Sequence, residues 1–442
     1  MRVNPNASHY SVVNNDIYKM VGLKRDIVGF SEIERDDLLL LDKFKLLVDN
    51  ELASRNTLDN LRLTGISVGV VKNGKLFFVN RGYHESDADN VMQKTEVTEN
   101  SVFMIGSITK TFVGTLLAYL SEAVDPKTNK PYVALDDPIN MYYKDAAPFI
   151  SNGRPKWPTL EQLASHSSGF PRDFFPECNT SENKYNRHDY QLMENTLNSM
   201  NYLYEPGTQF LYSGGVGVLG EILAKAYYGA QFPDEKGFED LLQEIICKPL
   251  GMNHTSTTPY YNSRMTRPHD NFGKPVNKFY GNVGSGAGKV FSTSAEMLLW
   301  PAMLMGNYLP DEMENFIKAA SKAYVPRQLR DEGDNSCYVG LCWNIRPDRV
   351  VPTDAPYIYK QSKNKSEMFS KLFQPLANKG QRYGTLYSHR GLTYGYYSDL
   401  QMCPETNTAV VMLVNNKVEG YLGNLYRLTF DIMDWVLNAD AK

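Results

Sequence analysis

The 442-residue sequence has no long hydrophobic run and no long basic run. No segment reaches the roughly 18 consecutive apolar residues that a membrane-spanning helix needs. The 46 Lys and Arg residues are balanced by 50 Asp and Glu residues, and the formal net charge of −4 attracts neither nucleic acid nor an anionic membrane surface. The opening segment, "MRVNPNASHYSVVNNDIY", has one basic residue and lacks the apolar core of a secretory signal. We therefore expect a cytoplasmic protein without nucleic-acid or membrane partners.

Paired cysteines and internal repeats are also missing. The five cysteines are an odd number without a Cys-x-x-Cys pair, which argues against a disulfide framework and a zinc ribbon: Cys178, Cys247, Cys337, Cys342 and Cys403. We expect solitary, mostly buried thiols, and neither a metal nor a cofactor. Without a fixed-period repeat or a low-complexity block, solenoid and propeller architectures are excluded.

The composition, 42% apolar and 22% charged, supports a large hydrophobic core and more than one structural lobe. Apolar residues recur at helical spacing through residues 34–54, which predicts an amphipathic helix. Two strand-like runs follow in "LTGISVGVVKNGKLFFVNRGY", and Asn73-Gly74 between them tolerates the positive φ of a tight hairpin turn.

The carboxyl-terminal part mirrors this pattern. "YGYYSDLQMCPETNTAVVMLVNN" contains two strand-like runs around Pro404 to Asn407, and a helix is predicted for residues 419–438. We expect the two ends to share one sheet and the chain between them to be mainly helical, at 109–123, 159–166, 189–200, 216–229 and 237–247. The predicted fold is α+β, with an antiparallel sheet flanked by helices from residues 1–110 and 283–442, a mainly helical lobe from 111–282, and a loop-rich insertion at about 305–385.

The segment "GSITKT" has two interpretations, a shortened phosphate-binding loop or a nucleophilic serine with its base. A Walker-type loop needs a glycine directly before its lysine, so that bare backbone N–H groups can wrap the phosphates, and that position is Thr109. Gly106 stands only four residues before Lys110, which leaves too little chain for the cradle. The sequence therefore argues against a phosphate-binding loop.

Ser107 and Lys110 form the second interpretation. Three positions apart on a helix, their side chains share one face, and a lysine kept neutral by burial can accept the serine proton. The positive end of the helix would stabilise negative charge that develops near Ser107. The same spacing recurs at Ser181/Lys184 and Ser362/Lys365, but only Ser107 precedes a long apolar helix. A helix-capping serine is the alternative.

A second motif, "YSGG", follows the turn at Pro206-Gly207 and leads into another apolar helix. At this position we expect the Tyr212 side chain to face the active site rather than to pack in the hydrophobic core. Near a lysine ammonium, its phenol could relay the serine proton to a leaving group. The alternative is a core tyrosine, one of 29 in the chain.

A third motif, "HRG", leads into a strand. His389 would supply a polar or cationic wall, and Gly391 would let a substrate acyl group approach the strand edge closely. The N–H of Leu392 could pair with that of Ser107 as an oxyanion hole. The alternative for His389 is an ordinary surface histidine.

In this order, Ser107-x-x-Lys110, Tyr212-Ser213-Gly214 and His389-Arg390-Gly391 resemble the three motifs of the penicillin-recognising serine hydrolases. The chain most resembles the class C β-lactamase branch, with its DD-peptidases, D-aminopeptidases, family VIII carboxylesterases and lovastatin-type acyltransferases. Supporting segments are "LASHSSGFP", "YEPGTQFLYS", "GAGKVFSTSAEM" and "YVGLCW". The resemblance implies a β-lactamase/transpeptidase-like fold with the active site between the lobes. It also implies that Ser107 is acylated, that Lys110 and Tyr212 are the general-base pair, and that Ser107 and Leu392 supply the oxyanion N–H groups.

Two residues depart from the family pattern. Gly214 replaces the asparagine whose amide contacts amide substrates, and His389 replaces the third-motif lysine, for which Arg390 would substitute in part. We therefore expect an esterase or transesterase that forms an acyl-Ser107 intermediate from a small-molecule ester and passes the acyl group to water or an acceptor alcohol. The alternatives are a D-aminopeptidase, amidase or β-lactamase-like peptidase and, from another class, a non-catalytic binding protein that retains the fold.

Overall fold

A computed structural model defines the fold for residues 10–12, 41–50, 63–85, 95–173, 187–258, 263–276, 284–307, 310, 313–331, 337–346, 384–417, 425, 428–430, 432–433 and 436. Cys178 and the two other Ser-x-x-Lys pairs, 181–184 and 362–365, lie outside these residues. Among the residues that are described, the four other cysteines are free and buried, as expected: Cys247, Cys337, Cys342 and Cys403.

The amino-terminal hairpin forms as predicted. Strands β2 (Gly65–Lys72) and β3 (Lys75–Gly82) pair in antiparallel register and are joined by Asn73 and Gly74 alone. The φ angles of these two residues are +49° and +73°. Two positive φ values give a turn whose twist matches that of the flanking strands, which is why Asn-Gly is favoured there.

The two ends of the chain share one antiparallel sheet, as predicted. Strands β14 (Tyr397–Cys403) and β15 (Thr408–Val414) are joined by the 3-10 turn η11 (Pro404–Thr406), and β15 pairs directly with β2. Nine strands are described in this sheet, in the order β1-β3-β2-β15-β14-β13-β12-β11-β10. The remaining members are β1 (Tyr10–Val12), β10 (Gln328–Arg330), β11 (Cys337–Val339), β12 (Asn344–Arg346) and β13 (Leu386–Leu392).

The loop-rich insertion at about 305–385 stays a prediction, since residues 347–383 lie outside the described part of the chain, but the described residues of this stretch include short regular elements. Strands β10, β11 and β12 extend the sheet beside β13, and α10 (Glu314–Ala320) with the 3-10 turn η8 (Ser321–Tyr324) packs against the helix that follows Ser107. Strands of three residues are too short to show a period of two, so the sequence pattern could not reveal them.

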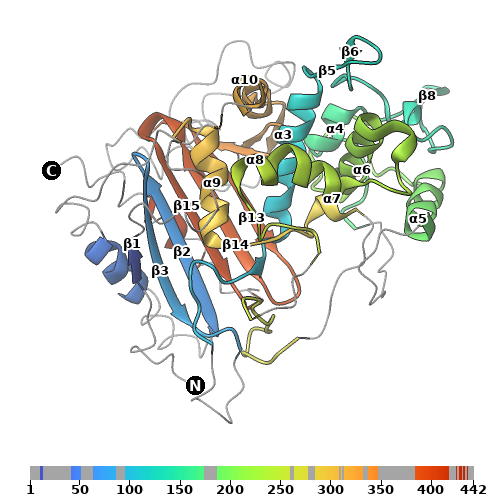
Figure 1. Cartoon of the computed structure of the whole chain (residues 1–442). Helices are drawn as coiled ribbons and strands as arrows, with labels where there is room; N and C mark the ends of the chain where they lie inside the picture. Colours follow the sequence, from blue (N-terminus) through green and yellow to red (C-terminus); the bar gives the residue numbers. More distant parts are fainter. Residues whose placement is uncertain are drawn as a thin grey trace.

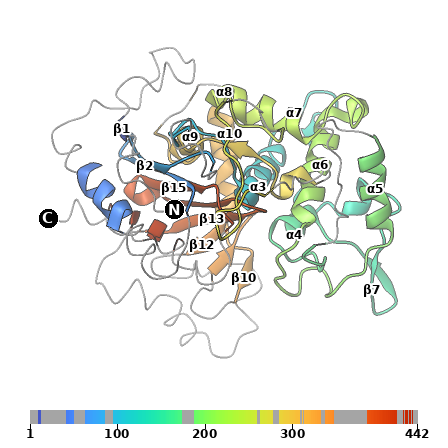
Figure 2. The same ribbon diagram turned by 90° about the horizontal axis from the view of Figure 1, so that it is seen from below.

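Both faces of the sheet are covered, and Figures 1 and 2 show the helical residues 41–50 and α9 (Ser294–Leu304) on opposite sides. Alternate residues of β15 face these two layers: Val410 and Met412 pack with the 41–50 helix, and Val411 and Leu413 with the layer that contains α9. This explains why β15 is apolar throughout. The described residues within the predicted helices 34–54 and 419–438 are helical.

The predicted helices between the two ends are present, and they lie beside the sheet in Figure 1. They are α3 (Thr109–Leu120), α4 (Leu160–Ala164), α5 (Arg187–Asn198), α6 (Gly215–Tyr228) and α7 (Phe238–Leu242), which continues through the π-turn η5 (Gln243–Cys247) into α8 (Lys248–Leu250). Short strand pairs join some of them: β4 (Phe103–Met104) with β9 (Phe291–Ser292), β5 (Val124–Asp125) with β6 (Lys130–Pro131), and β7 (Phe149–Ser151) with β8 (Arg154–Lys156). The division into two lobes at the stated boundaries stays a proposal.

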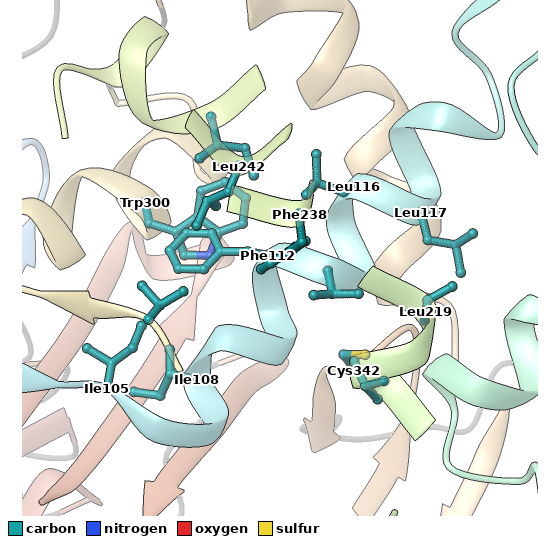
Figure 3. Close-up of a cluster of buried hydrophobic side chains, with 14 of the residues drawn as sticks. Ile105, Ile108, Phe112, Leu116, Leu117, Leu219, Phe238, Leu242, Trp300 and Cys342 are labelled. Carbon is teal, nitrogen blue, oxygen red and sulfur yellow. The ribbon is translucent and has the colours of Figure 1, made fainter. Parts of the chain in front are cut away.

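A continuous hydrophobic core surrounds α3 (Figure 3). Phe112 of α3 packs on Trp300 of α9, with ring centroids 4.7 Å apart, and both side chains are fully buried. Leu116 and Leu117 extend this contact along the same helix. The helix that follows Ser107 is therefore held from several sides. No helix in the described part of the chain is long and apolar enough to cross a bilayer.

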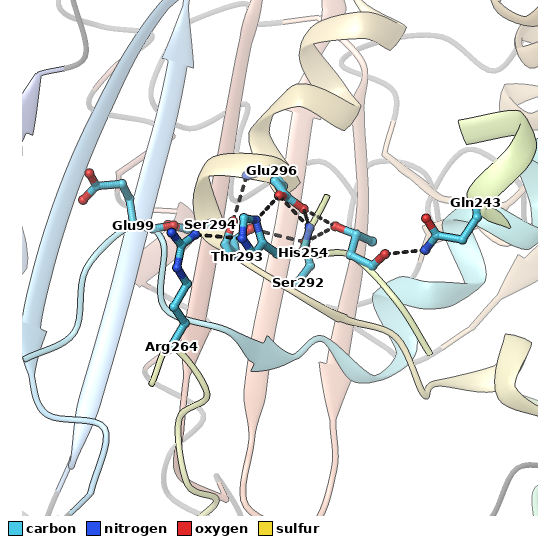
Figure 4. Close-up of polar contacts among 9 residues, drawn as sticks. Glu99, Gln243, His254, Arg264, Ser292, Thr293, Ser294 and Glu296 are labelled. Carbon is cyan, nitrogen blue, oxygen red and sulfur yellow. Dashed lines mark hydrogen bonds and ion pairs between the residues drawn. The ribbon is translucent and has the colours of Figure 1, made fainter. Parts of the chain in front are cut away.

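A buried carboxylate ties the loop after α8 to the start of α9 (Figure 4). Glu296 accepts hydrogen bonds from the backbone N–H of His254, at 2.9 and 3.0 Å, and from Thr255 Oγ1 at 2.7 Å. His254 Nδ1 lies 2.7 Å from Glu296 Oε1, and Arg264 Nη1 donates to His254 Nε2 at 2.8 Å. Because arginine can only donate, the neutral ring carries its proton on Nδ1 and donates it to Glu296. The cluster anchors α9 under the sheet.

The close packing of α3 predicts the effect of Gly114→Ala. Alanine is normally favoured over glycine inside a helix by about 1 kcal/mol. A Cβ at residue 114, however, would lie 2.0 Å from Leu341 O and 2.9 Å from Cys342 Cβ. We expect the free energy of unfolding in urea to fall by about 1–3 kcal/mol.

Gly220→Ala in α6 is the matched control. The atom nearest to the new Cβ at residue 220 would be in the Phe238 side chain, 3.1 Å away, rather than in a backbone carbonyl. This variant should change the free energy of unfolding by less than about 1 kcal/mol. Equal losses in both variants would contradict the packing at Gly114.

Candidate active site

Ser107 lies in a 3-10 turn, η2 (Gly106–Ile108), directly before α3. Gly106 has a φ of +52°, and a Cβ on it would lie 2.9 Å from Leu392 N and 3.0 Å from Gly391 Cα. Glycine is therefore required twice, for the left-handed backbone and for the close approach to the end of β13. The glycine thus lets the turn before α3 lie directly beside the end of a strand.

Lys110 points back at Ser107. Lys110 Nζ lies 3.1 Å from Ser107 Oγ and also donates to the carbonyl of Ala287. The lysine is buried, whereas Ser107 is partly exposed. The N-cap of α3 is Ile108, without a side-chain hydrogen bond, so Ser107 does not cap the helix. The structure brings the predicted nucleophile and base together.

Thr109, the residue that argued against a phosphate loop, has a structural role instead. Its Oγ1 donates to Gly106 O at 2.6 Å and accepts from Val290 N at 3.2 Å. These bonds join the turn that carries Ser107 to the segment that contains Ala287. The lysine and its carbonyl partner are thereby held on one rigid unit.

Tyr212 lies half-buried next to Lys110, just before α6. The centroid of its ring is 5.1 Å from Lys110 Nζ, within the range of a cation–π contact. The segment is fixed by Gly214 N, which donates to Arg172 O at 2.8 Å. The tyrosine therefore belongs to the same site as Ser107 and is not a core residue.

His389, on β13, closes the site from the sheet side. Its ring centroid is 6.3 Å from that of Tyr212. Nδ1 lies 2.8 Å from the carbonyl oxygen of Arg390, and since a carbonyl only accepts, Nδ1 carries the proton. Burial, reinforced by the charge of Lys110, lowers the pKa of His389 to about 3. The expected polar or cationic wall is thus a neutral one, and the surface-histidine alternative is wrong.

Arg390 and Gly391 do not have the positions expected from the motif. Arg390 pairs in register with Asp399, whose carboxylate accepts from Thr429 on the far side of the sheet, so the Arg390 side chain lies on the face opposite Ser107. A Cβ on Gly391 would lie 2.0 Å from Ile105 O. The space beside Gly391 is therefore filled by protein backbone rather than left for an acyl group.

The end of β13 abuts the nucleophile turn. Ser398 Oγ of β14 donates to Ile105 O at 2.7 Å, which joins the sheet to the residue before the turn. Leu392 N lies beside Gly106, and the Leu392 side chain is 46% exposed. The two N–H groups of the predicted oxyanion hole, from Ser107 and Leu392, thus belong to adjoining segments.

The motifs did not reveal three further residues near the site. Arg172 lies with its guanidinium carbon 6.0 Å from the Tyr212 ring centroid. His166 stacks on the same ring at 4.4 Å, and Ala287 supplies a carbonyl to Lys110. Two of them stand in segments already noted for their resemblance, "LASHSSGFP" and "GAGKVFSTSAEM", but only the folded chain shows what they contact.

A sequence model of the β-lactamase family matches residues 50–432 of this chain. The chain belongs to the β-lactamase family. Among its curated relatives, the β-lactamase of Pseudomonas fluorescens is 24% identical over 361 residues, which cover 80% of this chain and 88% of the relative. The D-alanyl-D-alanine-carboxypeptidase/endopeptidase AmpH of Escherichia coli (strain K12) is 29% identical over 250 residues, 54% of this chain and 56% of the relative. Family membership makes the protein a serine β-lactamase-like hydrolase.

Solved members of the family have the same fold. The D-alanine carboxypeptidase AmpC from Burkholderia cenocepacia superposes with a TM-score of 0.65 at 22% identity, over 89% of this chain and 99% of that chain. A class C β-lactamase gives a TM-score of 0.65 at 19% identity, over 89% and 96% of the two chains. The predicted β-lactamase/transpeptidase-like fold is confirmed.

The neutral state of His389 predicts a pH dependence of stability. An unfolded histidine has a pKa of about 6.5, whereas that of folded His389 is about 3. Between these values the unfolded chain binds the proton and the folded chain does not, so this stabilisation is complete above pH 6.5 and is lost as the pH falls toward 3. At pH 5 the loss amounts to about 2 kcal/mol.

The variant His389→Gln isolates this contribution, because glutamine does not titrate. Urea unfolding at pH 8 and pH 5 should show that the wild-type protein loses about 2 kcal/mol more than the variant between these two pH values. The same pH dependence in both proteins would show that folding does not lower the pKa of His389.

Proposed function

We propose that the protein is a serine esterase or transesterase that acts on a small-molecule ester through an acyl-Ser107 intermediate. The observation that carries the proposal is the 3.1 Å contact between Lys110 Nζ and Ser107 Oγ, within a family whose members are serine hydrolases. When Lys110 is neutral, the same contact carries the serine proton to the amine.

The proposed reaction begins when Ser107 Oγ attacks the ester carbonyl while its proton passes to Lys110 Nζ. The N–H groups of Ser107 and Leu392, on adjoining segments, stabilise the tetrahedral oxyanion. The bond to the leaving oxygen then breaks, and Tyr212, beside Lys110, relays the proton to the departing alkoxide. Water or an acceptor alcohol then attacks the acyl carbon and gives its proton to the Tyr212 and Lys110 pair. The bond from the acyl carbon to Ser107 Oγ breaks, and the same pair returns the proton to Ser107.

Two residues favour a neutral ester over a β-lactam or peptide. Gly214 offers no side-chain amide to an amide substrate. His389 is neutral, and Arg390 lies on the other face of the sheet, so the third motif supplies no cation to a substrate carboxylate. An uncharged ester needs neither a side-chain amide nor a cation to bind in the site.

A peptidase or amidase is the second candidate. It is favoured by the relatives and solved structures named as D-alanine carboxypeptidases. Turnover of D-alanyl amides faster than that of matched esters would select it. A non-catalytic binding role would instead leave Ser107 unreactive toward fluorophosphonate probes.

Incubation with p-nitrophenyl esters of several acyl lengths tests the proposal. We expect burst release of p-nitrophenol and a mass increase on the peptide that contains Ser107. Ser107→Ala should abolish the adduct, and Lys110→Ala should slow acylation by roughly 10²–10⁴-fold, the usual contribution of a general base.

Ser121→Ala is the matched serine control, since Ser121 lies at the other end of α3 and donates to Ala118 O. Lys127→Ala, at an exposed position, is the matched lysine control. Both should keep wild-type rates. If the wild-type protein formed no adduct with any of these esters, the proposed esterase or transesterase activity would be excluded.

If the neutral His389 ring is what disfavours substrates with a carboxylate, His389→Lys should favour them. The new ammonium should raise kcat/KM for nitrocefin, a β-lactam with a carboxylate, by about tenfold relative to a neutral p-nitrophenyl ester, since a hydrogen bond to a charged group contributes about 1.5–3 kcal/mol. His389→Gln, which adds no charge, should leave this ratio unchanged. The same rise in both variants would show that charge does not set the preference.

A further inference from the structure

His166 contacts four consecutive residues of the segment that carries Tyr212. Its carbonyl oxygen accepts from Leu211 N at 2.8 Å, and its Nδ1 accepts from Ser213 N at 3.3 Å. Its ring lies on that of Tyr212, with centroids 4.4 Å apart and planes 36° apart. The ring also meets Phe210 edge-on at 5.8 Å. One residue therefore holds the backbone on both sides of Tyr212 and covers a face of its ring.

The support under His166 is itself rigid. His166 has a φ of +58°, a left-handed backbone conformation that residues other than glycine rarely adopt. Its side chain is 2% exposed. The neighbouring Ser167 N donates to Gln162 O at 2.9 Å, and Ala164 O accepts from Cys342 N at 2.9 Å. Backbone strain maintained by surrounding hydrogen bonds is typical of functional sites.

The protonation state of His166 follows from its partners. Because Nδ1 accepts from the Ser213 N–H, the ring proton is on Nε2, which is buried and has no hydrogen-bond partner among the described residues. Burial first, then the charges of Lys110 and Arg330, hold the pKa of His166 well below its usual range. Protonation of Nδ1 would break the bond to Ser213.

We propose that His166 is a positioning residue that fixes the ring of Tyr212 for proton transfer. Proton relay requires the phenol to stay within hydrogen-bond reach of the reacting atoms, and a stacked neutral ring restricts its motion without adding a competing charge. The inference rests on the proposed function, in which Tyr212 protonates the leaving alkoxide. His166 acts through Tyr212.

His166→Asn tests this role, since Asn keeps an acceptor for Ser213 and tolerates the left-handed backbone but lacks the ring. Two esters of the same acid are compared: an ethyl ester, whose alkoxide needs a proton, and a p-nitrophenyl ester, whose phenolate does not. We expect the ratio of kcat/KM values, ethyl over p-nitrophenyl, to fall by about tenfold or more. In a Tyr212→Phe background the same substitution should change the ratio by less than about twofold.

A merely structural role would lower both rates by the same factor, or would lower the ratio equally in both backgrounds, and either result would overturn the inference. His84→Asn is the matched control, because this buried histidine bonds Ser101 Oγ at 2.7 Å instead of a site residue. Its ratio should equal that of the wild-type protein.

Two spectroscopic measurements do not depend on ester turnover. The ¹⁵N spectrum of histidine-labelled wild-type protein should show His166 neutral with its proton on Nε2 from pH 5 to 8, and a proton on Nδ1 would overturn the inference even if the variant does not fold. In tyrosine-labelled protein, the Tyr212 ring signal, assigned with Tyr212→Phe, should shift in His166→Asn. An unchanged signal would contradict positioning, whereas a protein that hydrolyses neither ester refutes only the proposed function.

Discussion

The close approach of two backbones, at the turn before α3 and at the end of β13, is the constraint on which the rest of the site depends. Gly106 and Gly391 face each other there, and a Cβ on Gly391 would lie 2.0 Å from Ile105 O. A side chain at either position would separate Ser107 from the sheet. The positions of Ser107, Leu392 and His389 relative to one another all follow from this contact.

Helix α3 is held in this position by close packing along its first half. A Cβ on Gly114 would lie 2.0 Å from Leu341 O, which excludes any side chain at this position, and Phe112 packs on Trp300. Close packing keeps the helix from shifting along its axis. Lys110 is buried by the same packing, and its amine is left with Ser107 Oγ and Ala287 O as its hydrogen-bond partners in the described structure.

Local patterns predicted much of this molecule. The Asn73-Gly74 turn and the apolar helix after Ser107 each express a preference of nearby residues, and both are present. The pairing of Ser107 with Lys110 was predictable for the same reason, because both lie within one turn. Sequence motifs in order identified the family, and with it the place of Tyr212.

Features that depend on distant contacts were not predictable. Strand alternation alone places Arg390 opposite His389, but which of these two faces meets Ser107 depends on what covers each side of the sheet, and a motif does not contain that information. His166 belongs to the Tyr212 segment only through folding, since its bonds to Leu211 and Ser213 cross more than forty positions of chain. The Gly391 contact with Ile105 is of the same kind.

The hydrogen bond from Ser398 to Ile105 joins residues 293 positions apart, and it has a consequence for biosynthesis. Contacts of such sequence separation form late, because the intervening chain must first be ordered. During synthesis, the turn that carries Ser107 leaves the ribosome long before β13 and β14 exist. The turn that carries Ser107 therefore lacks its partner strand, with Leu392 at its end, until the chain is nearly complete.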